Sequence, residues 1–405
     1  MKNSEMAFST PDVNKLAILA ATLSGAAIPV STAGQNIGAA LLLLVFLLST
    51  PSWQKSRNFF LQPFALMGVM LGVYMALGTL WTSSDAEAAW RFFWKMRAYY
   101  IIPLLLFIFS KDFLRNYVLV SFGILGLIVV LLSCISAAFD YPIYKGLPGD
   151  WFIFKTHTYH NFYTALMASG LLSIVLTQRL TSAQSYILFT LIAIAGFDIL
   201  FLVTGRTGQI AFLCMLSLIL LMWNWRRGFA MLVGILLILA VIVPRFSPSF
   251  EDGVANAESD MRAYTSGNAN TPIGMRLAWH KASTQLILES PVFGHGTGSF
   301  KTEYKKLPAS ELHAPLSDNP HNDYLLLSVE LGIPGGLLLI GLLVAAAWQG
   351  RHLLLPWKLT LYSLLFGMGI STLANSFFTD NTTGLAFVVL SCALLSGPKD
   401  RDSSL

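Results

Sequence analysis

The sequence predicts an all-α polytopic membrane protein with about twelve transmembrane helices. Three observations support this class. The 405 residues are 55% hydrophobic and only 12% charged, whereas a soluble domain carries about 25% charged residues. Long apolar runs recur along the chain, and backbone groups in lipid must pair within helices or closed barrels. No ten-residue alternation of apolar and polar side chains is present, which argues against a barrel.

The expected membrane spans are apolar stretches of roughly 18–20 residues, the length that crosses a bilayer. They fall at residues 15–32, 36–50, 63–81, 92–110, 114–139, 160–177, 184–204, 208–224, 228–245, 333–349, 358–378 and 383–397. The first run resembles a signal peptide, but a second apolar run follows at once, so we interpret it as an uncleaved span. The three cysteines lie in apolar runs, so neither a disulfide framework nor a cysteine metal cluster is expected.

Charge in the short loops predicts the orientation. With a cytoplasmic N-terminus, 13 of the 26 Lys and Arg residues lie on the cytoplasmic side. Six others lie in one long outer loop, which has little influence on topology. Seven remain at the outer face: Arg91, Lys95, Arg97, Lys145, Lys155, Arg206 and Arg245. Both termini are therefore expected in the cytoplasm, and the outer cations either attract phosphate groups or extend to lipid headgroups.

The long outer loop, residues 246–332, divides the chain into three parts. Residues 1–245 hold the first nine spans, and residues 333–405 hold the last three spans with a cytoplasmic tail. The loop is expected to begin with a mobile polar stretch, residues 251–271. An amphipathic helix is then predicted from Pro272 to Glu289, capped by Thr271 and stopped by Pro291. A glycine-rich turn follows, and then a short amphipathic helix, 321–331, lying against the bundle before "GIPGG" turns into the next span.

Arg206 lies in the segment "TGRTGQ", a tight turn between two spans. Flanking glycines permit close approach of a ligand to the backbone, and a helix starting near Thr207 offers N–H groups to an anion. An arginine at this position can grip a phosphate with two hydrogen bonds. An interfacial arginine in a hairpin loop is the alternative interpretation, and we favour the functional one.

Two further candidates lie in the long loop. Arg276 and His280 are four residues apart and share one helix face, although a solvated polar face explains the same pattern. His321 lies in "NPHNDY", and a neutral imidazole is a good general base near pH 7. Asn319, Asn322 or Asp323 would set its tautomer, or the cluster only caps the following helix.

A metal site is not expected. Six of the seven histidines lie on the outer side, yet the sequence contains no HExxH motif and no Cys/His ligand spacing. His157 and His160 are three residues apart but lack an evident carboxylate partner. The segment "GHGTGSF" lacks the Lys-Ser/Thr pair of a phosphate loop and does not follow a strand, so nucleotide binding is not expected either.

Taken together, these motifs resemble the O-antigen ligase/polymerase superfamily, and most closely the O-antigen ligases of Gram-negative bacteria. The resemblance is sharp over about 200–336 and elsewhere rests on hydropathy. The matching positions are Arg206 in "GRTG", Arg276, Pro291, Gly294, Gly296, Gly298, Phe300, His321, Asn322, Leu325, Glu330, Leu331, Gly332 and Gly335.

The resemblance implies a GT-C-like membrane glycosyltransferase of the bacterial inner membrane, with its active site facing the periplasm. It would transfer a glycan from undecaprenyl diphosphate to a lipid A–core sugar by an inverting reaction without metal, cofactor or ATP. Arg206 and Arg276 would bind the diphosphate, and His321 would deprotonate or position the acceptor hydroxyl. Asn322 and His280 would contribute to substrate binding, and Arg91, Lys95 and Arg97 would form a second phosphate-binding patch. The expected partners are the two glycolipids and membrane lipids, with no nucleic acid.

Other functions share parts of this pattern. Related polymerases join repeat units, and related protein O-oligosaccharyltransferases glycosylate Ser or Thr, with the same motifs. Chain length and the single large loop favour the ligase. A transporter of lipid-linked glycans would place ionisable groups near the membrane midplane, where the sequence offers Asp198, a residue that alternatively supports Arg206.

Overall fold

The structure is a computed structural model that describes residues 10–49, 53–246, 248–308 and 314–400. Every regular element among these residues is a helix, and extended pairing is limited to two isolated bridges, Leu147 with Asp150 and Leu353 with Lys399. The helices are α1 (Pro11–Ala26), α2 (Thr32–Leu48), α3 (Trp53–Phe60), α4 (Pro63–Gly78), α5 (Ala86–Lys95), α6 (Arg97–Tyr100), α7 (Ile102–Phe109), α8 (Asp112–Ala138), α9 (His157–Thr177), α10 (Ser182–Phe197), the π-helix η1 (Asp198–Leu202), α11 (Arg206–Trp223), α12 (Trp225–Phe246), α13 (Pro248–Thr265), α14 (Pro272–Glu289), α15 (Phe300–Lys306), α16 (Asp323–Gly350), α17 (Leu355–Ser371) and α18 (Asn381–Leu395).

The helix composition fits an all-α membrane protein. Among the described residues, five helical stretches are long and apolar enough to cross a membrane: Asp112–Ala138, Ser182–Leu202, Arg206–Trp223, Trp225–Ile242 and Asp323–Gly350. Three shorter apolar helices are Thr32–Leu48, Pro63–Gly78 and Asn381–Leu395. Each predicted span overlaps helical residues in the described part of the chain, and whether twelve of them cross a bilayer stays a prediction.

The predicted span 92–110 is divided. Its residues belong to the end of α5, to α6 and to α7, with breaks at Met96 and Ile101. Pro103 lies at the start of α7, where its missing N–H costs no hydrogen bond, but it cannot continue a helix from the residues before it. The division separates Arg91 and Lys95 on α5 from Arg97 on α6.

The polar stretch expected to be mobile forms a helix instead. Residues Pro248–Thr265 make up α13, followed by a turn at Gly267 with φ 93°. Pro248 opens the helix, a position that suits its fixed φ. Within it Glu258 and Arg262 form an ion pair one turn apart, which supports a solvated helix. The prediction of a mobile stretch rested on polar composition alone and was wrong for the residues of α13.

The predicted helix Pro272–Glu289 is confirmed as α14, with the Thr271 hydroxyl accepting a hydrogen bond from the Gly274 N–H.

The predicted helix 321–331 and the following span are joined in α16, which bends at Gly332 with φ 71°. The glycine-rich turn, residues 294–298, explains this bend, because the turn packs against the inner side of the bend in α16. The Gly296 N–H donates to the Glu330 carbonyl, and the Gly298 N–H donates to the Glu330 carboxylate. A Cβ at Gly296 would lie 2.1 Å from the Thr82 Cα. The turn therefore packs between α16 and the α4–α5 connection and holds the two segments together.

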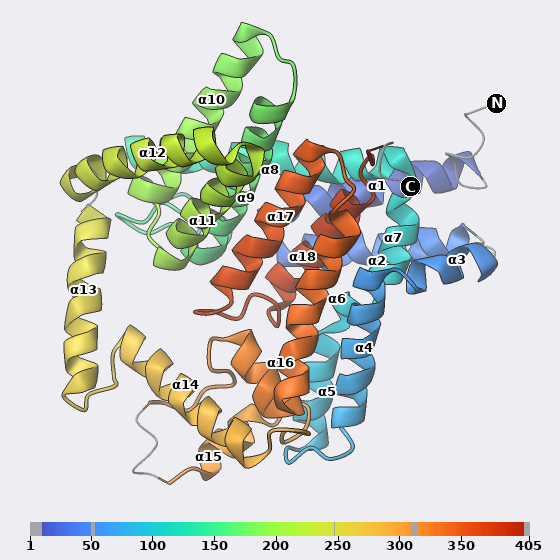
Figure 1. Ribbon diagram of the computed structural model, residues 1–405, viewed down its shortest axis with the longest axis vertical. Coiled ribbons are helices and arrows are strands. Elements are labelled where there is room, and N and C mark those ends of the chain that lie inside the picture. The colour runs from blue at the N-terminus through green and yellow to red at the C-terminus, as the bar shows by residue number, and fades with distance from the viewer. Residues whose placement is uncertain (1–9, 50–52, 247, 309–313, 401–405) are drawn as a thin grey trace.

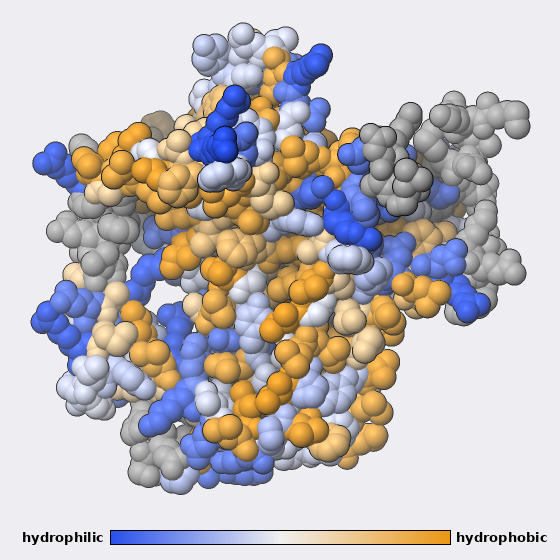
Figure 2. All heavy atoms as spheres, in the orientation of Figure 1, coloured by the Kyte–Doolittle hydropathy of each residue, from blue (hydrophilic) through white to orange (hydrophobic). Residues whose placement is uncertain are grey.

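The arrangement places the motif-bearing segment at one end of the molecule. Figure 1 shows α13 descending from the end of α12 along one edge, with α14 and α15 following beneath the lower end of α16. Figure 2 shows hydrophobic side chains over α12 and much of α16, whereas hydrophilic side chains gather around α13 and α14. The buried core joins α1, α2, α4, α7, α8, α9, α11, α16, α17 and α18.

Candidate active site at the α11, α14 and α16 helix starts

Three residues predicted from separate motifs lie in one cluster. Arg206 begins α11, Arg276 is on the second turn of α14, and His321 lies just before α16. Arg206 acts electrostatically on Arg276, and Arg276 acts on His321. The fold therefore brings together two guanidinium groups and an imidazole from distant parts of the chain.

The environment of Arg276 favours an anion. Burial lowers the pKa of Arg276, and the nearby positive charge of Arg206 lowers it further, while Asp260 opposes this effect. The Nε atom of Arg276 is buried and has no hydrogen-bond partner among the described residues. Two guanidinium groups that repel each other become stable together when an anion lies between them, and a phosphate matches the geometry of both.

His321 is held in an uncommon conformation. Its φ is 56°, a left-handed value that costs free energy in a residue other than glycine and is concentrated at functional sites. The Asn319 side-chain oxygen accepts the His321 backbone N–H at 2.9 Å. The ring lies on the indole of Trp279, with centroids 5.2 Å apart. These contacts fix both the backbone and the plane of the imidazole.

The electrostatics keep the His321 ring neutral. Burial is the largest cause that lowers its pKa, followed by the positive charge of Arg276, with a smaller effect from His280. A hydrogen bond with the Asn375 side chain opposes this lowering. Because the pKa lies below the ordinary value of 6.5, the neutral imidazole predominates at pH 7 and has the protonation state of a general base.

His280 lies beside His321 and shares the α14 face of Arg276. Burial lowers the pKa of His280, a hydrogen bond with the Pro320 carbonyl raises it, and Arg276 lowers it. Its Nε2 atom is buried without a hydrogen-bond partner among the described residues. A buried polar atom without a protein partner calls for an explanation, and ligand binding is one.

A layer of polar side chains supports the cluster from behind. The Ser376 hydroxyl donates to the Asn319 side-chain oxygen at 2.9 Å, and Asn375 donates to the Thr207 hydroxyl at 3.4 Å. Asn322 caps α16 through the Leu325 N–H and donates to the Leu373 carbonyl. The loop 372–380 thus connects the His321 segment to the start of α11.

Asp323 anchors that loop and is buried. Its carboxylate accepts hydrogen bonds from the Thr372 hydroxyl at 2.5 Å, the Phe378 N–H at 2.6 Å and the Thr379 hydroxyl at 2.6 Å. The sequence offered Asp323 as a group that could set the His321 tautomer. In the structure its carboxylate binds the loop 372–380 instead, and the side chain that hydrogen-bonds His321 is that of Asn375. Asn375 and Ser376 were not predicted at all, because nothing in their local pattern distinguishes them from ordinary loop residues.

The Arg206 turn is held by the residues that precede and begin α9. Asp150 accepts from both the N–H and the hydroxyl of Thr204, at 2.9 and 2.6 Å. The Asn161 amide donates to the carbonyls of Val203 and Thr204. Gly205 has φ 125°, and a Cβ at Gly208 would lie 2.3 Å from the Asn161 Cβ. Both glycines are therefore required by the turn and by close packing.

Both histidines at the start of α9 have carboxylate partners, which corrects the sequence prediction. His157 lies 3.3 Å from Asp150, and His160 lies 2.8 Å from Asp198. Asp198 begins the π-helix η1, a rare element that often occurs at functional sites. The sequence could not pair these residues, because Asp150 lies in the loop before α9 and Asp198 lies beyond α10, so only the fold brings them to the histidines. The sequence offered Asp198 as a residue that supports Arg206. In the structure its hydrogen-bond partner is His160.

The three cations of the predicted second patch have separate surroundings. Arg91 is exposed and pairs with Glu87 on the same helix. Lys95 lies close enough to Glu330 to act on it electrostatically. Arg97 donates to the Asn36 side chain and lies over the Trp94 ring. A role for these residues in substrate binding stays a prediction.

The described residues contain no group of three His, Cys, Asp or Glu side chains arranged to hold a metal ion. His313, one of the predicted outer histidines, lies outside the described residues.

The fold is an apolar helical bundle, and a cluster of cationic and histidine side chains lies at one end of it, as in a membrane protein with a site suited to an anion. The comparison with known families makes the class more specific. Residues 188–340 match the family described as O-antigen ligase, and this match supports membership of the chain in the O-antigen ligase family. Arg206, Arg276, His280 and His321 all lie in the matched segment. Among curated proteins, none matches the chain.

Proposed function

We propose that this protein is an O-antigen ligase that transfers a polysaccharide from undecaprenyl diphosphate to a lipid A–core sugar. The observation that carries the proposal is the cluster of Arg206, Arg276 and His321 at one end of the apolar bundle. A lipid-linked diphosphate and a glycolipid acceptor would both reach such a site from the membrane. The family match over residues 188–340 supports glycosyl transfer as the reaction class.

The two arginines would bind the diphosphate of the donor. As the bond between the anomeric carbon and the diphosphate oxygen breaks, negative charge develops on the leaving group. Fixed guanidinium groups stabilise that charge without rearranging, which is the main source of catalysis in sites of this kind. The buried Nε of Arg276 has a hydrogen left to donate to a phosphate oxygen.

His321 would act on the acceptor. Its neutral ring would take the proton of the sugar hydroxyl while the oxygen attacks the anomeric carbon from the face opposite the diphosphate. This in-line displacement inverts the configuration at that carbon. Trp279 and Asn375 would hold the ring in position during the reaction. The energy comes from the activated diphosphate, so no ATP is required.

Reconstitution with defined substrates tests the proposal. Purified protein in detergent is mixed with an undecaprenyl-diphosphate glycan and lipid A–core, with EDTA and without ATP. We expect a ligated product on a gel with the wild-type protein and none with His321→Ala. His352→Ala, a change at the opposite end of the bundle, is the matched control and should retain activity.

The alternative reactions give different products. An elongated lipid-linked glycan without attachment to the core would identify a polymerase, and transfer to a Ser- or Thr-containing peptide would identify a protein glycosyltransferase. Absence of transfer to every acceptor, in a preparation whose thermal unfolding is cooperative, would favour the transporter. Loss of product in EDTA would contradict the metal-independent mechanism.

A further inference from the structure

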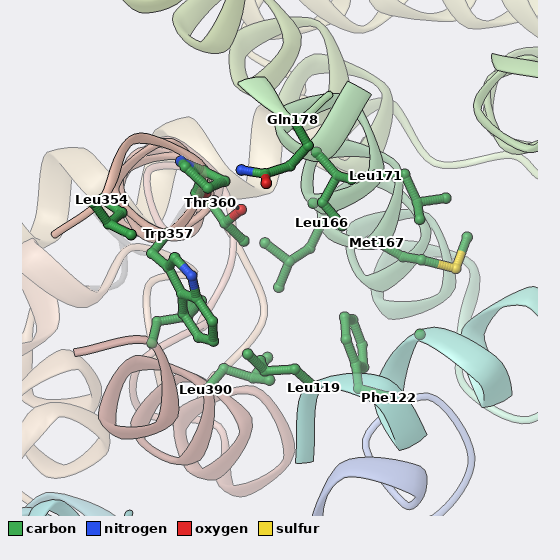
Figure 3. Close-up of a pocket in the computed structure, with 15 residues that line it drawn as sticks. Leu119, Phe122, Leu166, Met167, Leu171, Gln178, Leu354, Trp357, Thr360 and Leu390 are labelled. Atoms are coloured by element: carbon green, nitrogen blue, oxygen red, sulfur yellow. Dashed lines mark hydrogen bonds between the residues drawn. The ribbon is translucent and has the colours of Figure 1, made fainter. Parts of the chain in front are cut away.

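A cavity lies away from the candidate active site, between α8, α9, α17 and α18. It has a volume of about 360 Å³, within the range of small-ligand sites, roughly 300–1,000 Å³. Its lining residues are Leu119, Phe122, Gly123, Leu166, Met167, Gly170, Leu171, Ile174, Gln178, Leu354, Pro356, Trp357, Thr360, Leu390 and Leu394. Figure 3 shows these side chains converging from all four helices on one space.

The cavity is at the opposite end of the bundle from His321. The start of α9 holds the Arg206 turn, whereas Gln178 at its other end lines the cavity. The 21 residues of α9 span about 31 Å at 1.5 Å per residue. The helix α17 likewise runs from the cavity toward the candidate active site. It begins at the cavity, and its other end leads into the loop that carries Asn375. The cavity therefore does not belong to the site proposed for glycosyl transfer.

The walls select an apolar occupant. Apart from Gln178 and Thr360, which face each other at one side of the cavity in Figure 3, the lining is aliphatic or aromatic. Water in such a space would lack hydrogen-bond partners. A hydrocarbon chain fits these walls, and the surrounding bilayer supplies such chains.

The rim of the cavity is cationic. The Arg115 guanidinium lies 5.3 Å from the ring centroid of Trp357, and its Nε is buried with no partner among the described residues. Arg179 follows Gln178, and Lys358 follows Trp357. The nearby carboxylate, Asp112, is bound to Arg115. Arg115 thus lies against the cavity wall, and Arg179 and Lys358 each adjoin a lining residue in the chain, so this end of the cavity is complementary to a phosphate headgroup that carries net negative charge.

We propose that this cavity is a binding site for an anionic phospholipid. One acyl chain would occupy the space between α8, α9, α17 and α18, and the headgroup phosphate would lie at the rim beside Arg115, Arg179 and Lys358. The proposal does not depend on the reaction proposed above. Its occupant is a membrane lipid at the end of the bundle opposite the substrates.

Glycines on the cavity wall provide the test. A Cβ at Gly170 would touch only the Thr360 methyl at 3.8 Å, and a Cβ at Gly123 would meet nothing within 4 Å. Gly170→Leu and Gly123→Leu therefore fill the cavity without a backbone clash. Gly234→Leu is the matched control, because it adds the same side chain to α12 in open space. The pair Lys358→Gln and Arg179→Gln removes two rim charges and leaves the cavity unchanged.

The measurement is native mass spectrometry of delipidated protein titrated with phosphatidylglycerol or phosphatidylcholine of the same chain length. We expect wild type and Gly234→Leu to retain phosphatidylglycerol at least several-fold better than phosphatidylcholine. Both cavity-filling variants should lose this retention while unfolding cooperatively. The double rim variant should bind the two lipids equally. Retention of phosphatidylglycerol by either folded cavity-filling variant, or equal retention of both lipids by wild type, would overturn the proposal.

Discussion

At the scale of single residues, His321 carries the most specific chemistry. Burial and the charges of Arg276 and His280 lower its pKa below 6.5, so the neutral ring is still the major form at pH 6.5. We expect kcat/KM to be constant near neutral pH and to fall only in more acidic solution, where the ring becomes protonated. Initial rates of transfer as a function of pH measure this directly.

Replacing the neighbouring residue His280 should shift the pKa of His321 in a known direction. Its charge lowers the pKa of His321, so His280→Gln should raise that pKa and move the acid limb of the pH profile to higher pH. His352→Gln, at the other end of the bundle, should leave the profile unchanged. A profile that is identical in all three proteins would show that the acid limb does not report His321.

Arg276 is expected to act through the geometry of its guanidinium group as well as its charge. Arg276→Lys keeps the charge but replaces a two-pronged donor by a point charge. Losing one donor to developing negative charge typically lowers kcat by about 10²–10³-fold, and we expect a loss of this order. Arg262→Lys is the control, since Arg262 is exposed on α13 and pairs with Glu258. Full activity of Arg276→Lys would disprove bidentate binding.

At the scale of elements, the glycine-rich turn fixes the bend in α16. Gly296→Ala adds a Cβ 2.1 Å from the Thr82 Cα at φ 91°, whereas Gly267→Ala at φ 93° meets nothing within 4 Å. Both changes carry left-handed strain of about 1–2 kcal/mol, and overpacking adds about 1–3 kcal/mol for Gly296 alone. We expect Gly296→Ala to lower the thermal unfolding midpoint more than Gly267→Ala. Equal midpoints would show that the turn is not tightly packed.

The loop 372–380 depends on the Asp323 carboxylate. Asp323→Asn would put an amide NH₂ against hydroxyl and backbone donors that now share two carboxylate oxygens. An unsatisfied buried polar group costs about 1–3 kcal/mol, so this variant should lose both stability and transfer activity. Asp318→Asn changes only an exposed ion pair with Lys301 and should be close to wild type by both measures. A stable but inactive Asp323→Asn would mean that the loop is held by other contacts.

At the scale of the whole molecule, the sequence predicted the helical class and the cluster members but not their support. Hydropathy and capping located the apolar helices and α14, since both signals are local. The division of residues 92–110, the ordering of residues 251–265 as part of α13, and the partners of His157 and His160 depend on tertiary packing. Arg206 was predictable from its glycine-flanked turn, whereas Arg276 and His321 were assigned to the site through the combined motif, because a solvated helix face or a helix cap explains each of them alone. Asp150, Asn161 and Asn375 were missed because their roles come from contacts across the fold.

The orientation that the charges predict for the whole chain has a direct test. With the N-terminus in the cytoplasm, α14 and the His321 cluster face the periplasm, and the turn between α11 and α12 faces the cytoplasm. Lys281 on α14 and Arg226 in the first turn of α12 are exposed. Cys134, Cys214 and Cys392 lie within apolar helices. In intact cells, a membrane-impermeant maleimide should label Lys281→Cys and leave Arg226→Cys unlabelled until the membrane is permeabilised.

The reverse labelling pattern would place the arginine cluster on the cytoplasmic side. Lipid-linked glycan would then have to be used before it crosses the membrane, and the proposed ligation to lipid A–core on the outer face would fail. Labelling of both positions in intact cells would instead show that α11 and α12 do not form a membrane-crossing hairpin. The unsubstituted protein provides the background, because its cysteines lie among apolar side chains where the water-soluble reagent enters poorly.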